Sequence, residues 1–206
     1  MKILFFGDSI TDMGRDRNTD GVAGLGKGYV FYAAGDIKRE NPETEVINRG
    51  ISGNRVVDLY ARIKSDVWNL EPDLLSILIG VNDVWHEIGS QNGVDLDRFI
   101  KVYDMLIADT LKVLPNLKIV LCEPFVLKGA ATELNYDRFL EVKEYAKAVK
   151  ALAEKYGLPF LPLQDKLDEA AEKHGASYYL YDGVHPDAAG ARLIADEWMK
   201  LYKNIK

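Results

Sequence analysis

The chain has 206 residues, 48% of them hydrophobic and 28% charged, a composition that excludes general disorder and favours one domain with a buried core. A net charge of −6 without a Lys/Arg block argues against nucleic acid and anionic membranes as partners. The single cysteine, Cys122, cannot form an internal disulfide or a Cys-based zinc site, and no apolar stretch approaches the roughly 20 residues that span a bilayer.

Five short apolar runs recur along the chain and predict five strands. The first, residues 3–6, is shorter than the roughly 7–15 residues of a signal-peptide core, and together with the unpaired cysteine this favours a cytoplasmic protein. Most of the runs are continuous rather than alternating, as expected for strands buried on both faces. The runs cover residues 3–6, 46–47, 74–79, 119–121 and 160–163.

Stretches with helical spacing separate these runs. Residues 135–156 place Phe139, Val149 and Leu152 on one stripe, with charged residues opposite, which predicts a helix with one buried face. Similar spacing predicts helices at residues 28–40, 55–69, 96–113 and 187–203. Strands that alternate with helices require a mainly parallel sheet covered on both faces. The sequence therefore predicts an α/β fold, a three-layer α/β/α sandwich with a five-stranded sheet, in one domain spanning residues 1–206.

Four polar, glycine-rich segments lie where chemistry is expected in such a fold. Three follow the first three predicted strands, at residues 7–10, 48–54 and 80–83, and the fourth, residues 182–186, precedes the last predicted helix. In open parallel sheets, ligands bind beyond the carboxyl ends of the strands. We therefore expect these segments, distant in sequence, to converge on one edge of the sheet.

The four segments supply each group that acyl transfer requires. Ser9 is the candidate nucleophile, His185 the general base, and Asp182 the carboxylate that fixes the tautomer of the imidazole. The backbone amides of Ser9 and Gly53 and the side-chain amide of Asn82 are the candidate donors of an oxyanion hole. This combination predicts a serine esterase that acts through an acyl-enzyme.

The same segments resemble, in order, the four sequence blocks of the SGNH hydrolases, also called the GDSL esterase/lipase family. The blocks are Gly-Asp-Ser-Ile at 7–10, Gly53, Gly-x-Asn-Asp at 80–83 and Asp-x-x-His-Pro at 182–186. The resemblance covers nearly the whole chain and implies a flavodoxin-like sandwich, the roles given above, and no cofactor. Ile10 replaces the family's leucine, an exchange between apolar residues.

Longer strings resemble the branch of acetylxylan and acetyl-xylo-oligosaccharide esterases. They are Gly-Asp-Ser-Ile-Thr-Asp at 7–12, Asn-x-Gly-Ile-Ser-Gly-Asn at 48–54 and Gly-Val-Asn-Asp-Val-Trp at 80–85. This resemblance implies that the substrate is an acetylated oligosaccharide or a smaller acetyl ester, with Trp85 shaping the acyl or sugar pocket.

Two further residues are assigned as substrate-binding together with Trp85. His86 follows Asn82 by four residues and is expected on a loop at the mouth of the pocket. Asp8 is expected to brace the turn before Ser9 through backbone amides and, next to the nucleophile, to contact the substrate.

Several residues admit other interpretations. Asp8, Asp12 and Asp83 with His185 could form a metal site, as in a metal-dependent phosphoesterase, but a triad activates serine without one, so no metal is predicted. Cys122 is expected to be buried. His174 is expected at a helix C-terminus, where a basic residue complements the dipole.

Three aromatic residues and the exact function are left open. The aromatic residues before Asp182 could be core or a sugar-stacking wall; they are Tyr178, Tyr179 and Tyr181. A lysophospholipase or thioesterase of the same family and a non-catalytic carbohydrate-binding module are the alternatives to an acetyl esterase. The sequence also leaves open whether the chain forms a homo-oligomer.

Overall fold

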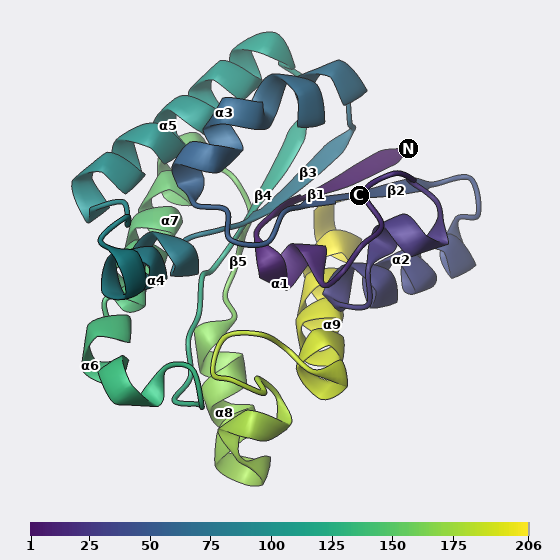
Figure 1. The fold of residues 1–206 in the computed structure, drawn as a ribbon. Helices are drawn as coiled ribbons and strands as arrows, with labels where there is room; N and C mark the ends of the chain where they lie inside the picture. The colour runs from purple at the N-terminus through teal and green to yellow at the C-terminus, as the bar shows by residue number, and fades with distance from the viewer. Residues whose placement is uncertain (206) are drawn as a thin grey trace.

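The computed structural model describes residues 1–205, and its five strands form one parallel sheet (Figure 1). The order across the sheet is β2-β1-β3-β4-β5, and all neighbouring pairs are parallel. Nearly every strand residue is buried, which explains the continuous apolar runs. The strands are β1 (Lys2–Gly7), β2 (Glu45–Gly50), β3 (Leu74–Leu78), β4 (Lys118–Cys122) and β5 (Phe160–Leu161).

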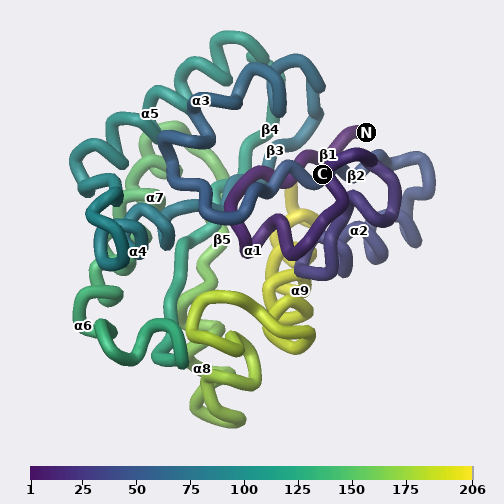
Figure 2. Tube along the Cα trace, viewed as in Figure 1, coloured from purple at the N-terminus to yellow at the C-terminus, as the bar shows by residue number. Residues whose placement is uncertain are grey.

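Helices cover both faces of the sheet, as Figures 1 and 2 show. On one face α2 (Tyr29–Glu40) packs against α9 (Ala188–Ile205). On the other face α5 (Leu96–Val113) packs against both α3 (Val56–Asp66) and α7 (Val142–Tyr156). The predicted three-layer α/β/α sandwich with a parallel five-stranded sheet is confirmed.

The predicted helices match the structure closely where one apolar stripe runs through a long segment. The helix predicted at 96–113 has those bounds, and those predicted at 28–40 and 187–203 differ by one or two residues at an end. The helix predicted at 55–69 is wrong at its C-terminal end, because α3 ends at Asp66 and a 3-10 turn, Trp68–Leu70, follows. The segment 135–156 is divided into α6 (Tyr136–Phe139) and α7.

The bounds of three further helices are not predicted, although the sequence indicates that His174 ends a helix. The three are α1 (Ser9–Asp12), α4 (Val81–Ser90) and α8 (Gln164–His174). Helix α1 is too short to show a periodic pattern, and α4 starts directly after β3 with Gly80 and Asn82, which favour turns. Helix α8 buries only Gln164, Leu167 and Ala170, so its apolar stripe is weak.

The strand order places the end of β1 at a special position. From β1 the chain runs outward to β2 and then returns to β3 on the other side of β1. Connections therefore leave in opposite directions on either side of the carboxyl end of β1, which opens a crevice there. Ser9 lies at this point, separated from the end of β1 by Asp8 alone.

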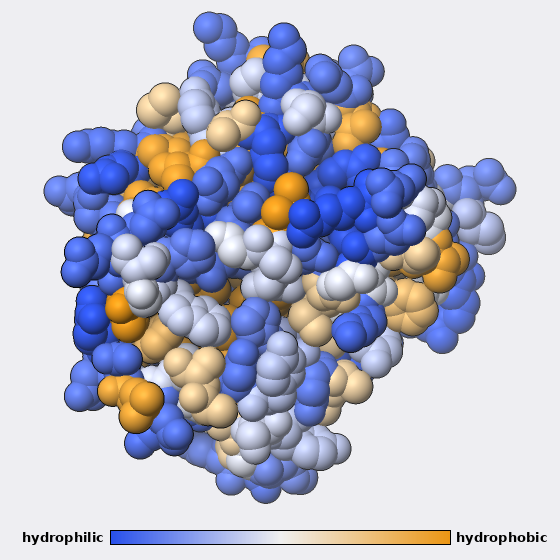
Figure 3. Space-filling view, viewed as in Figure 1, coloured by the Kyte–Doolittle hydropathy of each residue, from blue (hydrophilic) through white to orange (hydrophobic). Residues whose placement is uncertain are grey.

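The surface is mainly hydrophilic in the view of Figure 3, with hydrophobic residues in scattered patches. Exposed large hydrophobic side chains include Val22, Leu134, Tyr178 and Tyr181. No helix in residues 1–205 combines the length and apolarity that crossing a bilayer requires.

Candidate active site

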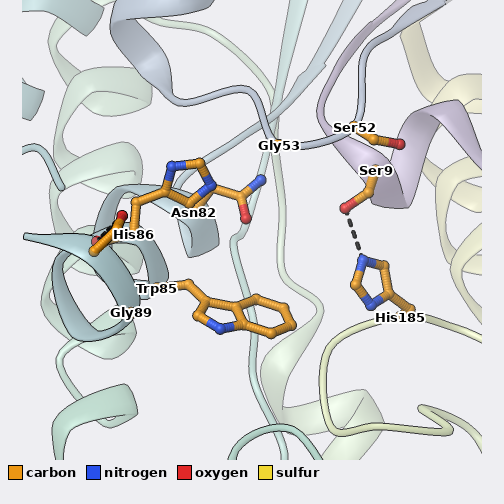
Figure 4. A pocket seen from close by; sticks show the side chains of 9 residues that line it. Ser9, Ser52, Gly53, Asn82, Trp85, His86, Gly89 and His185 are labelled. Carbon is orange, nitrogen blue, oxygen red and sulfur yellow. Dashed lines mark hydrogen bonds between the residues drawn. The ribbon is translucent and has the colours of Figure 1, made fainter. Parts of the chain in front are cut away.

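Three hydrogen-bonded side chains join the end of β1 to the loop before α9. Ser9 is the first residue of α1, and its Oγ lies 2.8 Å from Nε2 of His185, 176 positions later in the chain. The other ring nitrogen of His185, Nδ1, lies 2.7 Å from Oδ2 of Asp182. Figure 4 shows the Ser9 hydroxyl and the imidazole facing each other. The structure thus brings together the predicted nucleophile, base and orienting acid.

Asp182 is held as a carboxylate by three donors. Its Oδ1 accepts hydrogen bonds from the backbone N–H groups of Val184 (2.9 Å) and His185 (2.8 Å), and Oδ2 accepts one from the imidazole. Burial alone would raise the pKa of Asp182, but these hydrogen bonds outweigh it and lower that pKa below its ordinary value. A charged Asp182 accepts a hydrogen bond from Nδ1–H, which keeps the proton on Nδ1 and leaves Nε2 free to accept the Ser9 proton.

A neighbouring loop braces the segment that carries Asp182 and His185. The backbone N–H of Leu127 donates to Gly183 O at 2.8 Å, and that of Ala131 donates to Asp182 O at 2.9 Å. Gly183 has φ +98°, and a Cβ there would lie 2.6 Å from Leu127 O and from Thr132 Oγ1. Only glycine fits this conformation and this close approach, so the position of the base depends on Gly183.

The predicted oxyanion donors lie at the same edge of the sheet, beyond the carboxyl ends of β1, β2 and β3. As the first residue of α1, Ser9 has a backbone N–H without an intrahelical partner. Gly53 has φ +83°, which favours glycine, and it lines the same cavity as Ser9. Asn82 donates one Nδ2 hydrogen to Asn54 O at 3.0 Å, which orients the amide and leaves its second hydrogen to donate.

A cavity of about 440 Å³ connects these groups. It extends from the Ser9 and His185 side chains past Asn82 to the second half of α4 (Figure 4). Its lining combines serine, histidine and amide groups with the Trp85 indole. The lining residues are Ser9, Ser52, Gly53, Asn82, Trp85, His86, Gly89, Ser90 and His185.

Helix α4, and not the expected loop, carries three of the predicted site residues, Asn82, Trp85 and His86. The Trp85 ring packs edge-on against Phe139 and lies 5.8 Å from the His185 ring, so it forms an apolar wall beside the base. Burial and the nearby Arg55 guanidinium lower the pKa of His86. This lowered pKa favours the neutral form of His86, whose ring can both donate and accept a hydrogen bond.

Asp8 does not contact the cavity, and its predicted substrate-binding role is wrong. Its side chain is 0% exposed, and Oδ1 accepts a hydrogen bond from Ile10 N at 2.9 Å. Asp8 is the N-cap of α1, which agrees with the expected bracing of the turn. Burial raises the pKa of Asp8 to about 7, and Oδ2 is a buried oxygen without a hydrogen-bond partner.

Asp83 and Asp12 also have structural partners. Asp83 is buried and accepts a hydrogen bond from Val56 N at 3.0 Å, so it holds the start of α3. Asp12 pairs with Arg17. Within residues 1–205, no three His, Cys, Asp or Glu side chains are grouped so that they could hold a metal ion.

The other residues discussed in the sequence analysis are not part of the cavity lining. Cys122 is buried, as expected, and burial raises the pKa of its thiol to about 12. His174 ends α8, also as expected. Tyr178 and Tyr181 are exposed, so neither is core; the Tyr181 ring stacks on His185 with centroids 5.8 Å apart and lies outside the cavity lining.

Sequence reasoning missed three lining residues, Ser52, Gly89 and Ser90. Ser52 directly precedes Gly53 and could have been found by that adjacency. Gly89 and Ser90 lie three and four positions after His86, the spacing of one helix face. They would have been found only if residues 81–90 had been predicted as a helix.

Comparison with known proteins gives one consistent result. Residues 5–193 match the model of the GDSL-like lipase/acylhydrolase family. An acetylxylan esterase from Geobacillus stearothermophilus is 35% identical, with 97% of this chain and 92% of the relative covered.

Solved structures are similar over almost the whole chain. A Parabacteroides merdae protein assigned to the GDSL-like lipases is 40% identical with a TM-score of 0.93, covering 98% of this chain and 95% of the other. Axe2, an acetylxylan esterase from Geobacillus stearothermophilus, is 34% identical with a TM-score of 0.86, covering 97% and 93%.

The raised pKa of Asp8 predicts a pH-dependent stability difference between the wild type and Asp8→Asn. The folded-state pKa, about 7, exceeds the ordinary 3.8, so the stability contributed by the protonated carboxyl is full below about pH 4 and lost as pH rises to about 7. The variant stays neutral throughout. Between pH 5 and pH 8 its free energy of unfolding should therefore rise by roughly 2–3 kcal/mol relative to the wild type.

Urea unfolding of both proteins at several pH values measures this difference. Both proteins share every other titrating group, so the contributions of groups that do not interact with Asp8 cancel in the comparison. A difference that stays constant from pH 5 to pH 8 would show that Asp8 does not titrate in this range.

Proposed function

The chain belongs to the GDSL-like lipase/acylhydrolase family and is a carboxylic ester hydrolase, and we propose that it removes acetyl groups from xylo-oligosaccharides through an acyl-enzyme on Ser9. The observation that carries the proposal is the hydrogen-bonded chain from Ser9 through His185 to Asp182, which opens into a cavity with oxyanion donors. Each of these groups has a defined role in acyl transfer.

In the first half-reaction, Ser9 Oγ attacks the ester carbonyl carbon while His185 Nε2 accepts its proton. The carbonyl oxygen becomes an oxyanion, which accepts hydrogen bonds from the Ser9 and Gly53 backbone amides and from Asn82 Nδ2. Asp182 stabilises the imidazolium, which then donates its proton to the leaving alcohol oxygen as the C–O bond breaks. The products are the free sugar hydroxyl and acetylated Ser9.

In the second half-reaction, His185 removes a proton from water as the water attacks the acetyl carbonyl. The same oxyanion donors stabilise the second tetrahedral intermediate, and the imidazolium returns the proton to Ser9 Oγ. Acetic acid leaves and ionises to acetate in solution, and the enzyme regains its starting state. Neither half-reaction requires a metal or a cofactor.

The relatives support the catalytic roles. The Axe2 structures include three catalytic mutants in which a serine, an aspartate or a histidine is replaced by alanine. In Axe2 this aspartate and histidine are three positions apart, as Asp182 and His185 are here. The candidate site therefore has the same residue types as the catalytic residues of an acetylxylan esterase.

The cavity supports a sugar acetate as substrate. Its volume of about 440 Å³ far exceeds what a small acetyl group needs, so room remains for part of the alcohol. Trp85 offers an apolar wall, while Ser52, His86 and Ser90 offer polar groups that suit sugar hydroxyls. The name acetyl-xylo-oligosaccharide esterase, given to Axe2, fits this combination.

Replacing Ser9 with Ala should lower the turnover of p-nitrophenyl acetate by several orders of magnitude, because the triad acts as a unit. A fluorophosphonate probe should label the wild type on Ser9 and leave the variant unlabelled. Turnover in Ser9→Ala close to that of the wild type would refute the proposed nucleophile.

Replacing Asn82 with Ala removes one oxyanion donor. We expect kcat to fall by about 100- to 1,000-fold, with a smaller change in KM, since the donor matters most in the transition state. Steady-state kinetics and the thermal unfolding midpoint should be measured together. A loss confined to KM would contradict a role in oxyanion stabilisation.

Gly89 offers a test of the substrate class. A Cβ at Gly89 would have no heavy atom within 4 Å, and Gly89 lines the cavity, so the side chain of Gly89→Leu begins in open space beside the cavity. We expect kcat/KM for acetylated xylobiose to fall at least about tenfold, with a smaller change for ethyl acetate.

Gly35→Leu is the matched control, because Gly35 is also an exposed helix glycine with open space at its Cβ, but it lies on α2, away from the cavity. It should leave the kinetics with both esters unchanged. Equal losses for both esters in Gly89→Leu would contradict a sugar site at this end of the cavity.

A further inference from the structure

The loop with the oxyanion donor Gly53 is tied to the same short helix that carries Ser9. Asp12 is the last residue of α1, and its side chain is only 3% exposed. Its Oδ2 accepts hydrogen bonds from Ser52 N at 3.0 Å and from Ser52 Oγ at 3.2 Å. Ser52 directly precedes Gly53, and both residues line the cavity. One carboxylate therefore connects the two elements that must together surround the reacting carbonyl.

The Asp12 carboxylate is charged and fully engaged. Arg17 Nη2 donates to Oδ2 at 2.7 Å, and Arg15 N donates to Oδ1 at 3.2 Å. Burial alone would raise the pKa of Asp12, but the bonds from Arg17 and Ser52 outweigh it and lower that pKa. Hydrogen bonds to a charged acceptor are roughly twice as strong as neutral ones, so the charge strengthens both hydrogen bonds from Ser52 to Asp12.

Other contacts join α1 to the end of β2 but stop short of Gly53. Arg15 Nε donates to Gly50 O at 2.8 Å, and Asn48 Nδ2 donates to Thr11 O at 2.7 Å. The backbone of Gly50 also lies directly against that of Asp12, where a Cβ would overlap it. These contacts fix the base of the loop. Among the hydrogen bonds described between α1 and this loop, those of Asp12 reach Ser52, next to Gly53, while the other neighbour of Gly53, Asn54, is held by Asn82 of α4.

We propose that Asp12 is a positioning residue that sets the Gly53 amide at the correct distance from Ser9 for oxyanion stabilisation. The inference rests on the proposed function and deepens it. An oxyanion donor acts only when it lies about 2.7–3.1 Å from the oxygen that becomes charged. Ser9 N belongs to α1 and Gly53 N to the loop after β2, so the distance between them depends on the contacts that connect α1 to this loop. Asp12 makes such a contact through Ser52.

Two substitutions of Asp12 test the proposal. Asp12→Ala removes the acceptor, and we expect kcat per titrated active site to fall about 100-fold, close to the loss of one oxyanion donor. Asp12→Asn keeps an oxygen that can accept from Ser52 N but loses the charge, and we expect an intermediate loss of about tenfold. KM should change by less than about threefold in both, since the oxyanion exists only in the transition state and intermediates.

A control variant separates positioning from simple stabilisation. Glu123→Ala removes a similar tie, since Glu123 Oε2 accepts from Leu163 N at 2.6 Å and from Gln164 N at 2.8 Å, outside the cavity. It should lower the thermal midpoint and leave kcat unchanged.

The outcomes distinguish this inference from the proposed function. If Ser9→Ala is inactive but both Asp12 variants keep the wild-type kcat, only the positioning role is overturned. If Ser9→Ala remains active, the proposed function itself fails. Should Asp12→Ala not fold, Asp12→Asn decides alone: a folded variant with an unchanged kcat overturns the proposal, and a loss in kcat at constant KM supports it.

Discussion

The hydrogen bond between Ser9 Oγ and His185 Nε2 is the contact on which the candidate site depends. It joins residues 176 positions apart, so the whole fold has to place them. Ser9 lies just after β1, at the point where the connections of the sheet run in opposite directions. His185 lies in the loop before α9, which packs against α2 on one face of the same sheet. Because this bond forms where β1, β2 and β3 end, Gly53 and Asn82 line the same cavity as Ser9 and His185. A fold that moved either partner would leave a polar cavity without a base for its nucleophile.

The protonation of three acidic residues near Ser9 follows from how many donors surround each one. Asp182 and Asp12 accept several hydrogen bonds, and these lower the pKa of each despite burial. Asp8 has one bonded oxygen and one unpartnered oxygen, so burial dominates and raises its pKa to about 7. Asp182, next to His185, and Asp12, next to Ser52, therefore favour the charged form. A negative charge on Asp8, next to Ser9, is disfavoured. This arrangement suits a reaction in which an oxyanion develops beside Ser9.

The sequence predicts the sheet and the main residues of the site for physical reasons that also explain what it misses. Strands buried on both faces give continuous apolar runs, and Ser9, Asn82 and His185 each stand next to such a run or before a helix, so their convergence is predictable. Helix α4 was missed because Gly80 and Asn82 resemble a turn and no long apolar stripe follows. Gly89 and Ser90 were missed with it. A substrate-binding role was predicted for Asp8 because Asp8 precedes Ser9 in the sequence. The sequence does not show that the Asp8 side chain is buried and caps α1.

The most direct test of this account is to identify the acylated atom during turnover. The enzyme is mixed with an acetyl ester, quenched in acid within the first turnovers, digested, and its peptides are analysed by mass spectrometry. We expect acetyl on Ser9 in the wild type and, because a charged Asp182 orients the base, much slower formation of that adduct in Asp182→Asn. Acetyl on another residue would contradict the assignment of Ser9 as nucleophile. So would turnover with no acylated peptide in either protein, under conditions where deacylation is slow.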